Sequence, residues 1–325
     1  MIVVRTPVRT SFIGGGTDFA DFYLREGGCV LTSAIDKYVY VVLKERFDDK
    51  IYINYSKKEI VDDLDSVQHD LVREAMRITG IEKGVEVTTL ADVPSEGTGL
   101  GSSSSITVAL LHACHTYQSE MVTAETLAEE ACRIEIDTLG RPIGKQDQYI
   151  AAFGDLRFIT FESTGSVRVE RMRMPSADRA RLEDRLMLFD TNVARQSTDI
   201  LAQQKANITN SIENLRQMKF AAMEARKALE TGALDRFGEL LDDGWARKKR
   251  LAPKITNPEI DRLYAQAREA GAIGGKITGA GGGGFLLFYC PPENQDHVRS
   301  SLRGLRELRF HLDRQGTTVV LNSGS

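Results

Sequence analysis

The stretch PSEGTGLGSSSS at residues 94–105 decides how the rest of the chain is interpreted. It follows a strand-like run at residues 85–90 and leads into an apolar repeat that begins at Ile106, so we expect a strand, a glycine loop and a helix. Glycines let the main chain come close to a ligand, and the start of a helix presents N–H groups without intrahelical partners. A glycine turn with a serine N-cap is the alternative. The combination of strand, glycines and serines favours a phosphate-binding loop, but not a P-loop, because no lysine follows the glycines.

The composition is that of an ordinary globular chain, with 42% hydrophobic and 27% charged residues. A formal net charge of −4 and a pI of about 5.9 argue against nucleic acid as the main partner. No apolar run approaches the roughly 18 residues that span a bilayer, and the first residues lack a signal-peptide cleavage pattern, so we expect a cytoplasmic protein without a membrane partner. A length of 325 residues exceeds what one core usually serves, which predicts two domains, residues 1–165 and 166–325.

Cysteine and histidine are given no chemical role. The four cysteines include no CxxC pair, which indicates neither a disulfide framework nor a zinc site. Cys114 and Cys132 fall on helical repeats, where cysteine usually acts as a small buried hydrophobe. The five histidines include no HExxH arrangement.

The first glycine cluster along the chain, GGGTD at residues 14–18, follows a strand-like run at residues 2–13 that we expect Pro7 to break. Further strands are expected at residues 29–35, 38–44 and 51–55. A triple glycine followed by an acid predicts a tight, open turn that leaves the Asp18 carboxylate pointing outward. A plain turn with an Asx cap is the alternative.

Two carboxylates lie downstream of the glycine loop. A helix that opens at Thr123 carries Glu135 beside its apolar stripe, and Asp147 follows twelve residues later. A helix end near Gly140 and a turn through residues 142–144 would bring both carboxylates to one cleft. Taken separately, each acid is more often a solvated surface charge.

The second half of the chain begins with strand-like runs at residues 167–173 and 185–189 and continues with long helical repeats. One helix ends in the basic cluster Lys248-Lys249-Arg250, which is either a solvated helix terminus or a binding site for an anionic substrate. A third glycine stretch at residues 274–284 precedes an apolar strand at residues 285–289, so it is not a simple linker. The tail at residues 321–325 is expected to be disordered.

The three glycine stretches resemble, in order, the three motifs of the GHMP small-molecule kinases. The second motif, P-x3-GLGSSA, is matched except that Ser104 replaces alanine, and KITGAGGGGF resembles the third. The first motif of the galactokinase branch, P-x-R-x-N-x-I-G-E-H-T-D, has glutamate and histidine where this chain has Gly15 and Gly16. This departure removes two sugar contacts and implies a bulkier substrate. The finer resemblance is to bacterial D-glycero-D-manno-heptose 7-phosphate 1-kinases and related L-fucokinase domains.

The resemblance implies an α+β fold with two domains. The N-terminal half is expected to resemble domain 2 of ribosomal protein S5 and to bind ATP and Mg²⁺, whereas the C-terminal half is expected to be ferredoxin-like and to complete the substrate cleft. The implied reaction is in-line transfer of the γ-phosphoryl group of ATP to the anomeric hydroxyl of a sugar.

The resemblance also assigns roles to individual residues. The nucleotide would be held by residues of the glycine loop, namely Pro94, Gly97, Gly99, Leu100, Gly101, Ser102, Ser103 and Ser104. Ser103 and Glu135 would bind Mg²⁺, and Asp147 would be the catalytic base, with Arg9 or Lys145 keeping it ionised. The sugar would be held by Asp18, Gly15, Gly16, Thr17, Arg141, Arg195, Gly279, Gly281 and Gly282.

Three functions remain open at this point. The first is a heptose 7-phosphate 1-kinase, the second is a 1-kinase for an unphosphorylated sugar such as L-fucose or galactose, and the third is a non-catalytic sugar or nucleotide sensor. Intact Ser103, Glu135 and Asp147 count against the sensor. A phosphorylated substrate would need basic side chains to bind its phosphate, and the sequence does not choose among Arg141, Arg195, Lys248 and Lys249. The sequence also leaves open whether the protein forms a homodimer.

Overall fold

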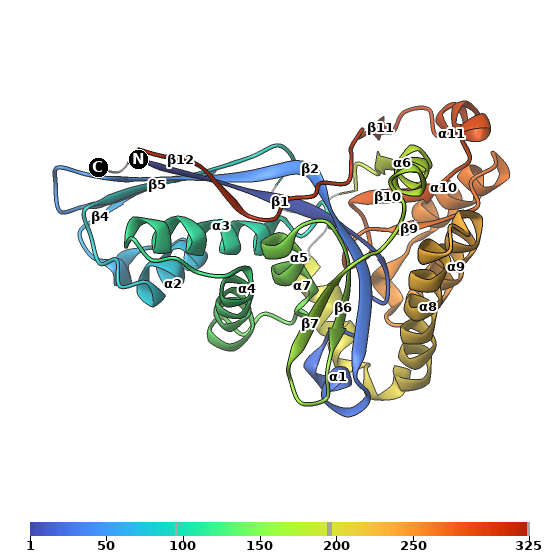
Figure 1. Cartoon of the computed structure of the whole chain (residues 1–325), viewed down its shortest axis with the longest axis horizontal. Helices are drawn as coiled ribbons and strands as arrows, with labels where there is room; N and C mark the ends of the chain where they lie inside the picture. Colours follow the sequence, from blue (N-terminus) through green and yellow to red (C-terminus); the bar gives the residue numbers. More distant parts are fainter. Residues whose placement is uncertain (95–96, 194–196, 324–325) are drawn as a thin grey trace.

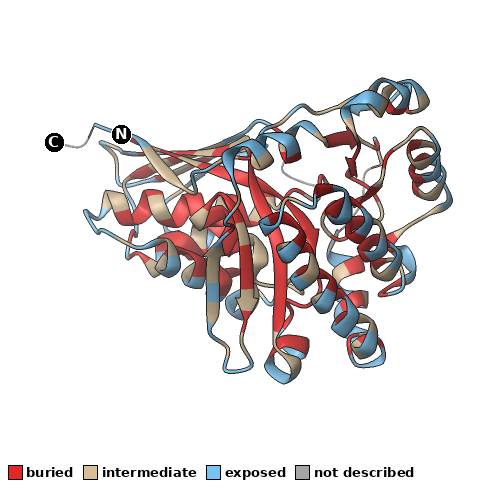
Figure 2. Cartoon of the chain, turned by 45° about the vertical axis from the view of Figure 1, so that its right-hand side comes forward, coloured by how far each residue is buried: buried red, intermediate tan, exposed pale blue. Residues whose placement is uncertain are grey.

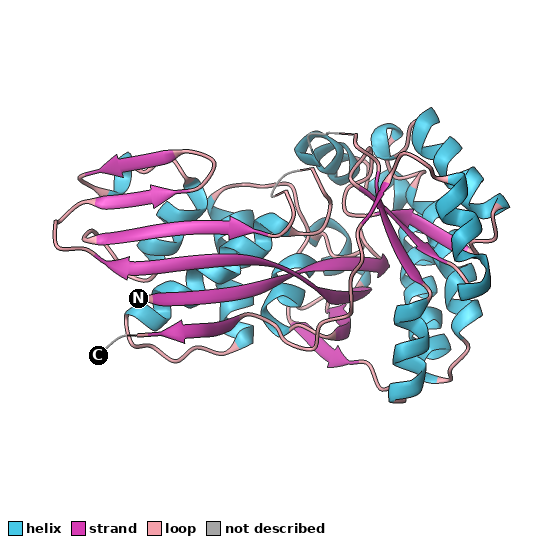
Figure 3. Ribbon diagram, turned by 90° about the horizontal axis from the view of Figure 1, so that it is seen from above, coloured by secondary structure: helices cyan, strands magenta, loops and turns pink. Residues whose placement is uncertain are grey.

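The computed structural model describes residues 1–94, 97–193 and 197–323, and within these ranges a large sheet and a small sheet each carry their own helices (Figure 3). The large sheet has the strand order β12-β1-β2-β5-β3-β4, with β6 paired to β2 and β7 paired to β6. Its strands are β1 (Ile2–Ile13), β2 (Gly28–Glu45), β3 (Ile51–Asn54), β4 (Lys58–Val61), β5 (Val85–Ala91), β6 (Leu156–Phe161), β7 (Val167–Arg171) and β12 (Thr318–Asn322).

Helices cover one face of this sheet, with α3 lying along it (Figure 1). They are α2 (Asp70–Ile78), α3 (Ser102–Tyr117), α4 (Ala124–Cys132) and α5 (Gln146–Phe153), while α1 (Ala20–Glu26) follows the first glycine cluster. The Thr123 hydroxyl caps α4 by accepting from the N–H of Thr126 at 3.1 Å, which confirms the expected helix start. A π-helical segment, Arg133–Thr138, continues α4.

The small sheet has the order β11-β8-β10-β9, and every pair in it is antiparallel. Its strands are β8 (Leu186–Asp190), β9 (Gly274–Ile277), β10 (Phe285–Tyr289) and β11 (Arg306–Glu307), and the helices of this half are α6 (Ser176–Asp184), α7 (Ser197–Ala206), α8 (Ile212–Glu230), α9 (Leu234–Lys248), α10 (Pro258–Glu269) and α11 (Gln295–Ser301). Sheets with helices in both halves confirm the predicted α+β class.

The two halves share a packed core (Figure 2). The Phe237 ring on α9 meets the Phe12 ring on β1 edge-on at 5.5 Å between centroids, and it meets the Tyr289 ring on β10 at 5.9 Å. Aromatic rings prefer such edge-to-face geometry. One side chain therefore links the two sheets. The boundary at residue 165 stays a prediction, and β7 and β12 both belong to the large sheet.

Three expectations about strands are wrong. Pro7 does not break β1; the register with β2 shifts between Pro7 and Val8 instead, and such irregularities tolerate a proline within a sheet. The expected strands at residues 29–35 and 38–44 form the single strand β2, which pairs first with β6 and then with β5. The expected disorder of the tail is wrong up to Asn322, because β12 pairs with β1. No helix of the described residues is long and apolar enough to cross a membrane.

Candidate active site

The glycine loop that contains Gly97, Gly99 and Gly101 ends at the start of α3. Gly97, Gly99 and Gly101 have φ angles of 76°, 72° and 76°, which residues other than glycine rarely adopt. Gly101, not a serine, is the N-cap of α3, and no side chain caps this helix start. The serine N-cap alternative is therefore wrong, and the helix start presents main-chain N–H groups without a side-chain acceptor. This local structure suits a phosphate.

The loop borders an ion pair between Arg9 on β1 and Asp147 in the first turn of α5. The Arg9 guanidinium donates to both carboxylate oxygens, from Nε at 2.7 Å and from Nη2 at 2.5 Å. Its Nη1 donates to the carbonyl of Gly99 at 2.6 Å. A methyl group on Gly101 would lie 3.2 Å from Asp147 Oδ2, so the loop and the carboxylate are in contact. The side chain of Asp147 is 22% exposed, which leaves it accessible to a reactant.

Lys145 does not pair with Asp147 in any described contact. Its ammonium lies 5.4 Å from the centroid of the Tyr23 ring, in a cation–π arrangement. Of the two residues proposed to keep Asp147 ionised, the structure therefore brings Arg9 to the carboxylate.

Glu135 and Ser103 lie together beneath the loop. The π-helical turn carries Glu135 into the interior, where it is 1% exposed. Its Oε2 accepts from the hydroxyls of Ser103 at 3.5 Å and Ser104 at 3.2 Å, and its Oε1 accepts from Gln148 Nε2 at 3.3 Å. Burial raises the pKa of Glu135, and the Arg141 charge opposes this shift. A buried carboxylate beside a hydroxyl fits Mg²⁺, which binds oxygen ligands and compensates the negative charge.

Arg141 lies beside this oxygen pair. Its Nη1 donates to Ser103 Oγ at 2.7 Å and lies 3.5 Å from Glu135 Oε2, while its Nη2 donates to Asp70 at 2.9 Å. Arg141 therefore serves as the protein's own counter-charge to Glu135. Its role toward a sugar stays a prediction, and Arg195 lies outside the described residues.

Asp18 is buried, so the expectation that its carboxylate points outward is wrong. It is 2% exposed, its Oδ1 accepts from the N–H of Gly16 at 2.8 Å, and its Oδ2 accepts from Gln146 Nε2 at 3.1 Å. Burial raises the pKa of Asp18 and the Asp147 charge raises it further, whereas the Gly16 hydrogen bond opposes both. The carboxylate stabilises the glycine turn from within, because its hydrogen-bond donors come from the turn itself and from the start of α5.

The other members of the first glycine cluster differ from one another. Thr17 is fully buried, and its hydroxyl bonds to main-chain groups of Gly14 and Cys29. A methyl group on Gly16 would lie 2.7 Å from Gln204 Nε2, so a side chain from α7 fills that space. Only at Gly15 are all contacts of such a methyl 3.5 Å or longer. The space expected from two glycines is therefore available at one of them.

The third glycine stretch packs against the second. Gly279, Gly281 and Gly282 have φ angles of 62°, 100° and 77°, and the N–H of Gly282 donates to the carbonyl of Ile255 at 2.7 Å. The Thr278 hydroxyl donates to the carbonyl of Thr98 at 2.9 Å. This contact brings the C-terminal half to the glycine loop that precedes α3.

Sequence reasoning did not predict the burial of two lysines, Lys248, which it named as one candidate for a substrate phosphate, and Lys276, to which it gave no role. Lys248 is 6% exposed and its ammonium donates to the carbonyl of Gly279, so a fully solvated helix terminus is wrong for this residue. Lys249, in contrast, is one-third exposed and pairs with Asp261 at 3.2 Å. Lys276 is 3% exposed and donates to the carbonyl of Ser11 at 2.7 Å. Lys248 belongs to the basic cluster and Lys276 to the third motif, but neither sequence pattern indicates that the side chain is buried.

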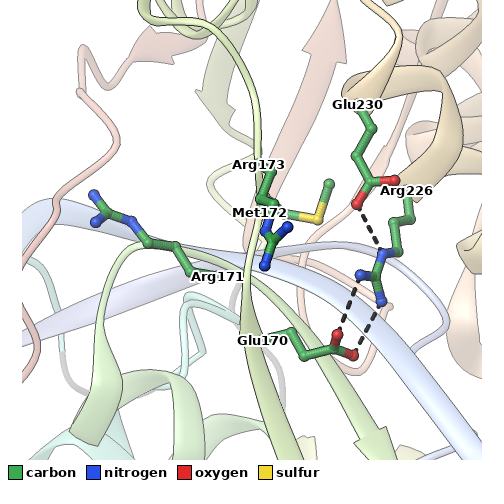
Figure 4. A pocket seen from close by; sticks show the side chains of 6 residues that line it. All are labelled: Glu170, Arg171, Met172, Arg173, Arg226 and Glu230. Atoms are coloured by element: carbon green, nitrogen blue, oxygen red, sulfur yellow. Dashed lines mark hydrogen bonds and ion pairs between the residues drawn. The ribbon is translucent and has the colours of Figure 1, made fainter.

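A cavity of about 840 Å³ lies apart from these residues, between β7 and α8 (Figure 4). Arg226 on its wall pairs with Glu170 at 3.0 and 3.2 Å and with Glu230 at 3.0 Å, which compensates its charge. None of the residues proposed for the active site line it. We therefore assign the chemistry to the Arg9–Asp147 region.

Comparisons with known proteins agree with the three motifs. Residues 67–155 match the GHMP kinases N terminal domain and residues 225–305 match GHMP kinases C terminal. The D-glycero-alpha-D-manno-heptose 7-phosphate kinase of Campylobacter jejuni is 31% identical, covering 93% of each chain. The L-fucokinase/L-fucose-1-P guanylyltransferase of Bacteroides fragilis is 25% identical over 92% of this chain and 35% of its own length.

A solved structure, of a D-glycero-D-manno-heptose 1-phosphate kinase from Bacteroides thetaiotaomicron, superposes with a TM-score of 0.83 at 25% identity and covers 100% of both chains. The fold and the resemblance inferred from the glycine motifs are thus confirmed. Because both halves are matched and a relative of 31% identity spans nearly the whole chain, this protein belongs to the GHMP kinase family of ATP-dependent kinases.

Proposed function

We propose that this protein transfers the γ-phosphoryl group of ATP to the anomeric hydroxyl of D-glycero-D-manno-heptose 7-phosphate, giving the 1,7-bisphosphate used in nucleotide-activated heptose synthesis. The heptose 7-phosphate kinase relative supports the acceptor. The observation that carries the chemistry is the Asp147 carboxylate, held by Arg9 against Gly101 of the glycine loop. A phosphate in the loop and a hydroxyl at Asp147 would therefore be neighbours.

In this mechanism Asp147 accepts the proton of the attacking hydroxyl. The hydroxyl oxygen forms the new bond to the γ-phosphorus, the bond to the bridging oxygen breaks, and ADP leaves with the electron pair. Arg9 orients the carboxylate through two hydrogen bonds, and the main-chain N–H groups from Gly99 to Ser104 hold the nucleotide phosphates. Mg²⁺ bound by Ser103 and Glu135 would neutralise phosphate charge. We expect the reaction to take place in the cytoplasm.

The test is ADP release from ATP and Mg²⁺ with a panel of sugars, with phosphorus NMR to locate the new ester. We expect turnover of the heptose 7-phosphate and a product with a second phosphate at the anomeric carbon. Faster turnover of L-fucose or galactose than of any sugar phosphate would overturn the acceptor assignment. Nucleotide binding without turnover of any sugar would favour a sensor.

The catalytic assignment is tested by Asp147→Asn, which removes the proton acceptor and keeps the side-chain shape. We expect kcat to fall by about 10²–10⁴-fold, the usual contribution of a general base, with an unchanged circular dichroism spectrum. Asp137→Asn is the matched control, because it makes the same change at an exposed aspartate, on the π-helical segment. Wild-type activity of the Asp147 variant would refute the assignment even if the acceptor is correct.

A further inference from the structure

Three polar side chains converge on the one open position of the first glycine cluster. A methyl group on Gly15 would lie 3.5 Å from Gln146 Nε2, 3.6 Å from Ser11 Oγ and 3.9 Å from Lys248 Nζ. We call Ser11, Gly15, Gln146 and Lys248 the Gly15 cradle. They come from β1, the glycine turn, α5 and the end of α9, so the cradle exists only in the folded chain.

Two members of the cradle have unpaired polar atoms. Ser11 is 3% exposed, and its hydroxyl has no hydrogen-bond partner within the described part of the chain. The buried Oε1 atom of Gln146 also has no partner there, but an amide oxygen only accepts hydrogen bonds, so this atom does not itself indicate a phosphate. A buried hydroxyl without a partner costs about 1–3 kcal/mol, so a polar ligand that bonds to it is favoured. The Ser11 hydroxyl therefore points to a ligand rather than to packing.

Both basic and acidic side chains lie around the cradle. Lys276 lies beneath it, donating to the carbonyl of Ser11 at 2.7 Å. Its pKa lies well below the usual value, first because of burial and then because Lys248 and Arg9 are positive, and Asp18 and Asp147 offset this only in part. The lowered pKa favours the neutral amine of Lys276, so Lys248 and Arg9 are the basic side chains that supply positive charge near the cradle. Gly15 itself has no side chain that could supply a further negative charge.

We propose that the Gly15 cradle binds the phosphate monoester that the acceptor already carries, and that Lys248 selects phosphorylated over unphosphorylated acceptors. This inference rests on the proposed function and identifies the group that the sequence did not choose. Lys248 and Ser11 bind the phosphate oxygens as donors, and Gln146 Nε2 is a third donor. The γ-phosphate of ATP is the other source of the same chemistry. The acceptor is favoured because Gly101 of the glycine loop lies against Asp147, whereas none of the three atoms nearest to a methyl on Gly15 belongs to that loop.

The first experiment replaces Lys248 by methionine, which keeps the chain length and removes the charge. Steady-state kinetics are measured with heptose 7-phosphate and with the same heptose lacking the phosphate. A charge-assisted hydrogen bond of about 1.5–3 kcal/mol corresponds to a rise of about 10–150-fold in KM for the phosphorylated acceptor. The KM for ATP and the kcat/KM for the unphosphorylated sugar should stay within about two-fold.

Lys249→Met is the matched control, since Lys249 pairs with Asp261 at the surface, and it should leave every constant unchanged. A rise in the KM for ATP alone would show that the anion belongs to the nucleotide and would overturn the proposal. An equal loss with both sugars would assign Lys248 a structural role, through its bond to Gly279, and would overturn it too.

Gly15→Glu tests the cradle without removing a residue from it. Gly15 has no left-handed φ and a Cβ atom there would meet no contact under 3.5 Å, so we expect the fold to tolerate the change. The new carboxylate can pair with Lys248, so we expect an unchanged or higher thermal midpoint. We also expect weaker binding of the phosphorylated acceptor by 10-fold or more. Binding at wild-type strength would contradict the proposal.

Calorimetric titration with heptose 7-phosphate, without ATP, separates this inference from the proposed function. Binding that Lys248→Met and Gly15→Glu both weaken supports the cradle, even if the wild type phosphorylates no sugar and the proposed function fails. Turnover of heptose 7-phosphate with the same acceptor KM in the wild type and both variants keeps the function and overturns the cradle. Absence of wild-type binding overturns the cradle as well.

Discussion

Replacing Arg9 by methionine should destabilise the protein, because Arg9 ties two chain segments and the glycine loop together. The guanidinium makes three hydrogen bonds, two to Asp147 at 2.7 and 2.5 Å and one to the carbonyl of Gly99 at 2.6 Å. Its side chain is 5% exposed and that of Asp147 is 22% exposed. Methionine fills a similar volume but leaves the carboxylate without its counter-charge.

The size of the effect follows from this geometry. Removing one partner of a fully buried ion pair costs about 3–5 kcal/mol. Because about a fifth of the Asp147 side chain reaches solvent, water recovers part of this loss, and we expect the free energy of unfolding to fall by about 2–3 kcal/mol. The kcat should also fall, by about 10²-fold, because the carboxylate loses its orientation.

The assay is urea unfolding followed by circular dichroism and by fluorescence of the only tryptophan, Trp245, which is buried in the small-sheet half. Arg5→Met is the control, because Arg5 lies on the same strand but bonds to Gln315 in an exposed contact, and it should cost under about 1 kcal/mol. In the double variant with Asp147→Leu the loss should be smaller than the sum of the single losses. Additive losses, or a change below about 0.5 kcal/mol in Arg9→Met, would refute this account of the pair.

Two further predictions concern other parts of the fold. Gly144→Ala should lower the free energy of unfolding by about 1–3 kcal/mol in urea titrations, because a methyl group there would collide with the Asp18 carboxylate; an unchanged value would contradict the close contact. His115 lies between Glu120 at 2.6 Å and Glu130 at 2.7 Å; burial lowers its pKa, but the hydrogen bonds to Glu130 and Glu120 outweigh burial, so the pKa is raised. This stabilisation is fully present below about pH 6.5, the unfolded value, and is lost as the pH rises through the folded pKa, so His115→Gln should lower the thermal midpoint more at pH 6 than at pH 9. An equal loss at both pH values would show that His115 acts only by packing.

Much of the candidate site could be predicted from local patterns. Glycines spaced at residues 97, 99 and 101 specify a backbone that other residues avoid, and the helix that follows has free N–H groups whatever surrounds it. These requirements involve only a few consecutive residues, so they can be recognised in the sequence. The α+β class and the family followed from the same stretches, and the comparisons confirm both.

Other features depended on contacts between distant segments. Arg9 and Asp147 are 138 residues apart, and either arginine or lysine could have served the carboxylate until the fold placed Lys145 over Tyr23. The space expected at Gly16 is filled by Gln204 from α7, which no local pattern indicates.

The sequence by itself determined the glycine loop, the side chains proposed for catalysis and the family, because each depends on a short run of residues. Only the tertiary structure decided that Lys248 is buried beside Gly15 while its neighbour Lys249 pairs at the surface. It also decided that Asp18 is buried and that Leu321 and Asn322 belong to β12, which pairs with β1. The burial and ion pairing of such a residue depend on which distant segments pack around it, so they cannot be predicted from residue type and spacing.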